Sequence, residues 1–242
     1  MYFDAAAFCG HWPYHRVRNS DLEQMLERYH AVGIDAGLMS CLDAVFYQDP
    51  WEADRELVAA LAGTNWRVAM SVNPVMPWAG KLLSQGKQAG AVAVRLYPCV
   101  HDYAEDDSRV VALCQRAGEL GLPVILTMRM LDSRVCYLLH QRDPDMEQIS
   151  RLVRQCSGTK FLMSNSLAKE MQDIQPMPEN VWLDTAGLRS DFFLETQKDV
   201  PPERILFGSF APLQCVGSSM CLIPEELKQQ IMCNNAQAFL TL

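Results

Sequence analysis

Eight short apolar runs that alternate with longer amphipathic runs constrain the fold of this 242-residue chain more than any other feature. The predicted strands are Tyr2–Ala7, Ala36–Cys41, Arg67–Val72, Ala91–Tyr97, Pro123–Met128, Lys160–Ser164, Val181–Asp184 and Arg204–Gly208. Runs such as 92–94 and 124–126 are apolar on both faces of the strand, which is typical of parallel strands that helices cover on the outside. The sequence therefore predicts a parallel sheet.

The amphipathic runs predict helices between these strands. The clearest are Asp21–Val32, Trp51–Ala62, Asp107–Leu120, Met146–Cys156 and Glu225–Leu240. Ser20 with Glu23 three residues later predicts a capping box at the first of them, and Pro224 suits the first turn of the last. Gly33 and Gly121 follow helices, where a left-handed residue is needed.

Eight strand-then-helix units with no internal linker or repeat predict one α/β domain over residues 1–242, a (β/α)8 TIM barrel. A doubly wound open sheet is the alternative. That fold normally carries a glycine-rich phosphate loop after an early strand, and the sequence has none. The barrel is therefore the favoured fold.

Composition excludes several classes of protein. The net charge is −8 with a pI near 5.1, and Lys and Arg are scattered, so we expect no nucleic-acid interface. Nine Cys without a C-x-x-C pair, most of them in or beside apolar runs, indicate buried thiols in a reducing cytoplasm. With no basic segment before Asp4 and no apolar run of about 20 residues, we expect neither a signal peptide nor a membrane span.

In a TIM barrel the active site lies at the carboxyl ends of the strands. Six polar or aromatic residues end or follow strands four to seven, and they are Arg95, Tyr97, Arg129, Arg134, Asn165 and Asp184. His101 lies in the loop after the fourth strand. We predict that these residues form the functional site.

Several short motifs, in order along the whole chain, resemble the amidohydrolase-related branch of the metal-dependent hydrolase superfamily. They are Phe3-Asp4, Arg95-Leu-Tyr-Pro98, Gly121-Leu-Pro-Val124, Arg204-Ile-Leu-Phe-Gly-Ser209 with Pro212, and Asn235-Ala236. The resemblance implies a (β/α)8 barrel whose bound metal ion activates a water molecule for hydrolysis.

The positions that match the family's metal ligands depart from its pattern. Members usually carry His-x-His on strand one, a His at the ends of strands five and six, and an Asp after Gly-Ser on strand eight. The matching residues here are Ala6, Phe8, Thr127, Asn165 and Phe210. Ala and Phe offer no lone pair, and Thr and Asn are poor ligands for a transition metal. We therefore predict no metal and no cofactor, with a divalent metal on substitute ligands, such as His11 and His101, as the alternative.

The arginines indicate the kind of ligand. The planar guanidinium groups of Arg95, Arg129 and Arg134 suit a carboxylate, which predicts a small anionic ligand that Tyr97 also contacts. The alternative is that Arg95 and Arg129 form internal ion pairs with buried acids such as Asp4.

Two residues are predicted to move a proton. His101 is the best general acid or base, unless it is a loop histidine bonded to the backbone. Asp184 is either a base or the partner of an arginine. Asn165 is predicted to orient the substrate through its amide, or else to satisfy the loop backbone.

Three functions remain open from the sequence. The first is a hydrolase or lyase that acts on a carboxylate-bearing ligand without the usual metal site. The second is a metal-dependent hydrolase with substitute ligands. The third is a non-catalytic barrel for ligand sensing or for use as a partner subunit. The oligomeric state is also open, with a homo-oligomer among the alternatives.

Overall fold

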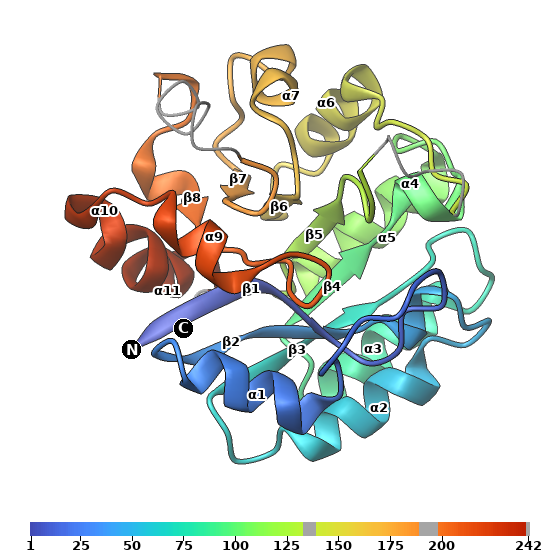
Figure 1. The fold of residues 1–242 in the computed structure, drawn as a ribbon. Helices are drawn as coiled ribbons and strands as arrows, with labels where there is room; N and C mark the ends of the chain where they lie inside the picture. Colours follow the sequence, from blue (N-terminus) through green and yellow to red (C-terminus); the bar gives the residue numbers. More distant parts are fainter. Residues whose placement is uncertain (133–138, 189–197, 241–242) are drawn as a thin grey trace.

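A computed structural model describes residues 1–132, 139–188 and 198–240 of the chain. Eight parallel strands follow one another around a barrel in the order β1 to β8, with helices on the outside (Figure 1). The strands are β1 Tyr2–Cys9, β2 Ile34–Cys41, β3 Trp66–Ser71, β4 Ala93–Leu96, β5 Val124–Thr127, β6 Phe161–Ser164, β7 Val181–Asp184 and β8 Ile205–Leu206. The predicted (β/α)8 barrel is confirmed.

The segment after β8 closes the barrel against β1. The Ala5 amide donates to the Phe207 carbonyl at 2.8 Å, and the Phe8 amide donates to the Ala211 carbonyl at 2.8 Å. The Asp4 carboxylate adds a third link, because it accepts the Ser209 N–H at 3.1 Å. Asp4 therefore ties the first strand to the end of the last.

The helices cover the outer face of the strands. They are α1 Leu22–His30, α2 Trp51–Ala60, α3 Ala79–Ala89, α4 Pro98–His101, α5 Ser108–Glu119, α6 Met146–Gln155, α7 Ala168–Asp173, α9 Val216–Cys221, α10 Glu225–Gln229 and α11 Asn235–Leu240, with short turns η1 Asp43–Val45, η3 Pro202–Arg204 and η4 Gln230–Asn234. The last predicted helix is divided, since the π-helical turn η4 separates α10 from α11. Helices α3, α4, α7 and α9 were not predicted.

The helix ends follow local chemistry, with one correction. The residue that caps α1 is Asp21 and not Ser20, because the Asp21 carboxylate accepts the Gln24 N–H at 3.0 Å. Gly33 and Gly121 have φ of 79° and 66°, the left-handed conformation that was predicted for them.

Two apolar layers fill the inside of the barrel. The first takes one residue from each strand: Ala5, Leu38, Ala69, Ala93, Ile125, Leu162, Trp182 and Leu206. Phe239 of α11 packs edge-on against Trp182 and covers this layer. The second layer lies at the mouth and contains Ala6, Phe8, Tyr97 and Phe210. In the described parts of the chain, no helix has the length and apolar character that crossing a bilayer requires.

Candidate functional site at the mouth of the barrel

Arg95 of β4 points into the barrel and has no exposed surface. Its Nε donates to the Ser40 hydroxyl at 2.9 Å, and its Nη1 donates to the Thr127 hydroxyl at 3.3 Å. The guanidinium carbon lies 4.6 Å from the centre of the Phe8 ring. The structure thus places Arg95 beneath Phe8, inside the barrel, and not in a wall that a ligand at the mouth would touch.

Two carboxylates, Asp4 and Asp184, are buried in the same interior without any exposed surface. Oδ1 of Asp4 accepts the Ala6 N–H at 2.8 Å, and Oδ1 of Asp184 accepts the Asn165 N–H at 3.0 Å. Burial raises the pKa of Asp4 to about 6, and it also raises the pKa of Asp184 above its ordinary value. Both acids therefore hold backbone in place at strand ends.

His101 lies at the end of α4, where its ring is packed against Tyr97 and Tyr103. Its Nε2 donates to the Val45 carbonyl at 2.8 Å, so this nitrogen carries the proton. Burial lowers the pKa of His101 below its ordinary value. The Tyr97 hydroxyl shares a hydrogen bond with Ser71 at 3.2 Å, and Tyr97 is fully buried. Nε2 of His101 and the Tyr97 hydroxyl are thus each bonded within the protein.

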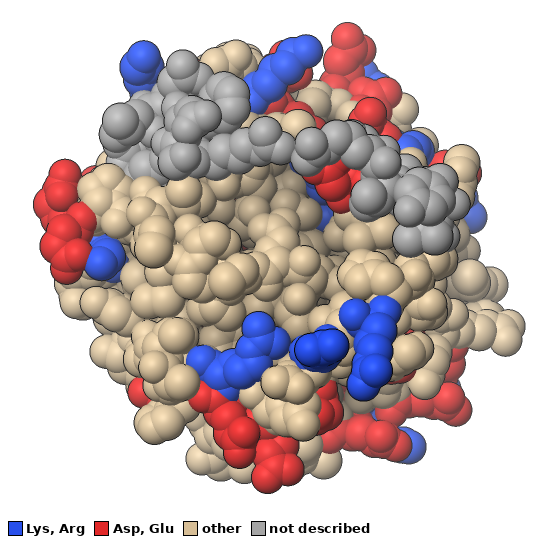
Figure 2. Space-filling view, in the orientation of Figure 1, with Lys and Arg blue, Asp and Glu red and all other residues tan. Residues whose placement is uncertain are grey.

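A cavity of about 620 Å³ opens at the carboxyl ends of β5 to β8 and is called the mouth cavity here. Its described lining is His15, Arg129, Met130, Leu131, Asp132, Asp143, Asn165, Leu167, Ala186, Gly187, Leu188, Leu213 and Gln214. Figure 2 shows that uncharged residues form the centre of the visible face, while charged side chains lie around it. The mouth cavity thus combines an apolar wall with a few polar groups, as ligand sites do.

The polar wall of the mouth cavity is built on an ion pair between Arg129 and Glu170. Both Nη atoms of Arg129 donate to the Glu170 carboxylate, and Nη1 also donates to the Asn165 carbonyl at 2.9 Å. Asn165 returns a bond from Nδ2 to the Arg129 carbonyl at 2.8 Å and accepts from Gln214 at 3.2 Å. These residues fix one another's positions.

The structure brings together only part of the predicted site. Arg129 and Asn165 line the mouth cavity, while Arg95, Tyr97, His101 and Asp184 do not. Arg134 lies outside the described residues.

Sequence reasoning missed two residues of this site, Glu170 and Gln214. Glu170 belongs to the six-residue helix α7, which is too short to show the periodic apolar pattern that predicts a helix. Its one local signal is the spacing to Leu167, whose N–H it accepts at 2.8 Å at the start of that helix.

The five strand-end positions do not fit a divalent metal ion. The Phe8 and Phe210 rings meet edge to face, 4.9 Å apart, and the Thr127 hydroxyl already accepts from Arg95. Asn165 is engaged with Arg129. Within residues 1–132, 139–188 and 198–240, no three His, Cys, Asp or Glu side chains are grouped so that they could hold a metal. We therefore derive no chemical step from a metal at these positions.

A family described as Amidohydrolase has a sequence model that matches residues 13–242. The chain belongs to the amidohydrolase family. No curated protein sequence matches it.

Solved structures of amidohydrolase-like barrels share the fold at low sequence identity. A 5-carboxyvanillate decarboxylase from Novosphingobium aromaticivorans DSM 12444 is 11% identical with a TM-score of 0.78, over 100% of this chain and 96% of that one. The enzyme of the same name from Sphingomonas paucimobilis is 13% identical with a TM-score of 0.77, over 100% and 99%. A dihydroxybenzoic acid decarboxylase from Polaromonas sp. JS666 is 14% identical with a TM-score of 0.74, over 100% and 97%.

These structures correct one prediction and refine another. The prediction of no cofactor is contradicted, because the Novosphingobium and Polaromonas enzymes hold manganese. The Novosphingobium enzyme also holds 4-hydroxy-3-methoxy-5-nitrobenzoic acid, and the Polaromonas enzyme holds 2-nitroresorcinol. All three are named decarboxylases, which are lyases and not hydrolases.

Proposed function

We propose that this amidohydrolase-family chain binds a small carboxylate-bearing acid in the mouth cavity and acts on it as a lyase. In this proposal a divalent metal ion is the cofactor, which the manganese of the similar structures supports. The five strand-end residues do not supply its ligands, and no group of three His, Cys, Asp or Glu among the described residues does so either. The 4-hydroxy-3-methoxy-5-nitrobenzoic acid that the Novosphingobium structure holds supports the choice of acid. The volume of the mouth cavity, about 620 Å³, supports a ligand of that size.

The observation that carries the proposal is the state of Arg129. A guanidinium has five N–H donors, and three of them serve Glu170 and the Asn165 carbonyl. The Nε hydrogen and the second Nη2 hydrogen have no acceptor among the described residues. Glu170 thus holds the guanidinium in one orientation while two donors stay free for a ligand carboxylate.

The rest of the mouth cavity suits the body of such an acid. Met130, Leu131 and Leu213 supply an apolar wall. The Gln214 carboxamide lies beside them and already donates to Asn165. An aromatic acid would therefore meet an apolar surface and a hydrogen-bonding edge at once.

Loss of carbon dioxide requires that the carbon left behind receive a proton. Asp184 and His101 remain our proposed proton-moving groups. Neither lines the mouth cavity, and the Asp184 carboxylate lies directly behind its wall, where it accepts the N–H of the cavity residue Asn165. Its role predicts a change in the pH profile of turnover, and not only in binding, when Asp184 becomes Asn.

The test uses the full-length, tag-free chain and two acids, 2,6-dihydroxybenzoate and 5-carboxyvanillate. Metal content is measured first. Binding is then followed by calorimetry, and carbon dioxide release is measured with and without added manganese. We expect saturable binding and release that depends on the metal.

The matched variants separate binding in the mouth cavity from general effects. The double variant Arg129→Gln/Glu170→Gln removes both charges and leaves neither buried alone, and it should weaken binding by about tenfold or more. The control Arg116→Gln/Glu119→Gln changes an exposed ion pair on α5 and should leave binding unchanged. If Arg129→Gln/Glu170→Gln binds the acids as tightly as the unmodified chain does, the proposed site is refuted. Binding without turnover under every metal condition would indicate ligand sensing.

A further inference from the structure

A second cavity lies outside the barrel, between the start of α2 and the start of α3, and is called the rim pocket here. Its volume is about 740 Å³. It is lined by Phe46, Tyr47, Gln48, Asp49, Trp51, Glu52, Trp78, Lys81, Leu82 and Gln85. It shares no lining residue with the mouth cavity, so the proposed function leaves it unexplained.

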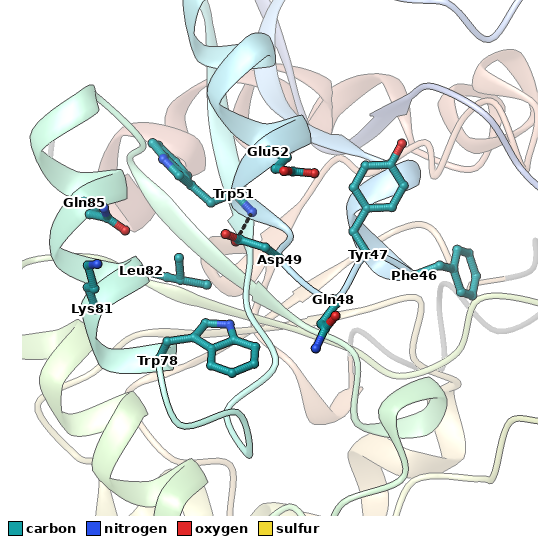
Figure 3. A pocket seen from close by; sticks show the side chains of 10 residues that line it. All are labelled: Phe46, Tyr47, Gln48, Asp49, Trp51, Glu52, Trp78, Lys81, Leu82 and Gln85. Atoms are coloured by element: carbon teal, nitrogen blue, oxygen red, sulfur yellow. Dashed lines mark hydrogen bonds between the residues drawn. The ribbon is translucent and has the colours of Figure 1, made fainter.

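Aromatic side chains give the rim pocket its shape. Figure 3 shows the indoles of Trp51 and Trp78 on opposite sides of Leu82. A Cβ at Gly86 of α3 would lie 3.5 Å from the Trp51 ring, so that ring packs closely against the α3 backbone. Both indoles are half-buried and so keep part of their surface in the cavity.

The outer edge of the rim pocket adds exposed apolar surface. Phe46 and Tyr47 are 37% and 47% exposed, and both are among the few large hydrophobic side chains that the described surface leaves open. The Phe46 ring packs against Trp12 and Tyr14, so the indoles of Trp51 and Trp78 are the aromatic surfaces closest to Leu82 in the pocket. Such surfaces suit a flat ring, because stacking and edge contacts add to apolar burial.

The charges of the rim pocket are divided between its two ends. Lys81 is exposed and pairs with no acid in the described structure. It lies in the first turn of α3, which contains no acidic residue, and the N-cap Trp78 makes no capping bond from its side chain. A cation at the positive end of a helix dipole is unfavourable, so an anion beside Lys81 would stabilise both.

The opposite end of the rim pocket is acidic. Glu52 in the first turn of α2 is exposed there. Asp49, which precedes α2, accepts the Trp51 N–H at 3.1 Å and lies closer to the centre of the pocket. Figure 3 shows Lys81 and Gln85 on one side of the pocket and Glu52 and Tyr47 on the other, with Asp49 between them. A ligand that fits this arrangement carries an anion at one end and a hydrogen-bond donor at the other.

We propose that the rim pocket is a binding site for a small aromatic acid with a hydroxyl or amino group across the ring from its carboxylate. The carboxylate lies at Lys81, the ring packs against Trp78, Leu82 and Trp51, and the donor faces Asp49. A ligand with a cation and no anion could pair with Asp49 or Glu52 but would leave Lys81 without an opposite charge. A neutral aromatic ligand would form no ion pair with Lys81.

The experiment uses the full chain labelled with 5-fluorotryptophan and the probe 4-hydroxybenzoate, followed by fluorine NMR. Of the five tryptophans, Trp51 and Trp78 line the rim pocket. Trp12 contacts the lining residue Phe46, so Trp66 and Trp182 serve as the internal references. Single Trp→Phe variants assign the resonances. We expect the Trp51 and Trp78 resonances to shift saturably with the probe, with a smaller affinity for unsubstituted benzoate.

A charge reversal on α3 tests the position of the carboxylate. Lys81→Glu should raise the Kd of 4-hydroxybenzoate by about tenfold or more, because it places a negative charge against the carboxylate. Lys87→Glu, at an exposed position in the last turn of the same helix, should change the Kd by less than about twofold. Both changes are at exposed positions, so the fold is kept.

Three outcomes would overturn the proposal. They are no saturable shift of the two resonances, a shift that Lys81→Glu leaves unchanged, and tighter binding of benzyltrimethylammonium than of the acid. The described lining of the mouth cavity holds no tryptophan. Probe binding that is lost in Arg129→Gln/Glu170→Gln without any shift of the two resonances would therefore keep the proposed function and refute this site.

Discussion

Replacement of Arg95 by Met tests whether one buried cation holds the centre of this barrel together. The guanidinium has no exposed surface and donates to the hydroxyls of Ser40 and Thr127. It also opposes the negative charges of Asp4 and Asp184, which are buried in the same interior. Methionine fills much of the same volume but supplies neither the charge nor the donors.

The size of the effect follows from the carboxylates that remain. Removal of one partner from a set of buried charges leaves the others uncompensated, which costs about 3–5 kcal/mol. For a domain of this size, 1 kcal/mol changes the melting temperature by about 2–4 °C, so we expect a decrease of roughly 6–20 °C.

The loss of stability in Arg95→Met should depend on pH. Burial raises the pKa of Asp4 to about 6, and removal of the guanidinium raises it further. An acid whose pKa is higher in the folded than in the unfolded chain contributes stability at low pH, and this contribution is lost as the pH rises through the folded pKa. The penalty should therefore be larger at about pH 8 than at about pH 5.

Urea unfolding at these two pH values measures the prediction. The double variant Arg95→Met/Asp184→Asn removes one of the uncompensated charges and should recover part of the lost free energy of unfolding at the higher pH. Arg109→Met, at an exposed position on α5, is the control for loss of an arginine. A loss below about 1 kcal/mol, or an equal loss at both pH values, would refute the reasoning.

Two further predictions concern the rest of the scaffold. Asp54 is buried and accepts the Ser71 N–H at 2.6 Å, and burial raises its pKa to about 8. The unmodified chain should thus lose stability as the pH rises toward 9, and Asp54→Asn should melt at the higher temperature at about pH 9 but not at about pH 6, as thermal unfolding across this range can check. A Cβ at Gly187 would overlap the Ser166 carbonyl at the mouth, whereas one at Gly158 would meet nothing within 4 Å. Gly187→Ala should therefore cost about 1–3 kcal/mol in urea unfolding while Gly158→Ala stays within about 0.5 kcal/mol, and equal effects would contradict the packing argument.

The sequence predicts the barrel well because its signal is local. Each strand is a short apolar run, and parallel pairing requires only that such runs alternate with helices. The structure contains all eight strands, and the pattern that revealed them does not depend on any distant contact. Helices such as α7 escape this reasoning because six residues are too few to show a period.

The site is harder to predict because its contacts join distant parts of the chain. Arg129 and Glu170 are 41 residues apart, and only the packing of α7 beside the end of β5 makes them partners. For Arg95 the sequence gives the inward direction, since Ala93 two residues earlier also faces the interior. It does not give the depth, and the structure shows that Phe8 lies between Arg95 and the mouth.

Asn165 shows why a residue type alone misleads at this site. Asn165 matches a position where family members carry a metal ligand, so from the sequence alone the asparagine indicates that metal binding has been lost. In the structure its N–H donates to the interior acid Asp184, while its side chain bonds to Arg129 and Gln214 in the mouth cavity. Its φ of 58° lies in the left-handed region, which asparagine adopts more readily than most residues. Asn165 therefore connects the buried polar interior with the mouth cavity. A ligand that displaces Arg129 would also displace Asn165, and through the Asn165 N–H it would change the hydrogen bonding of Asp184.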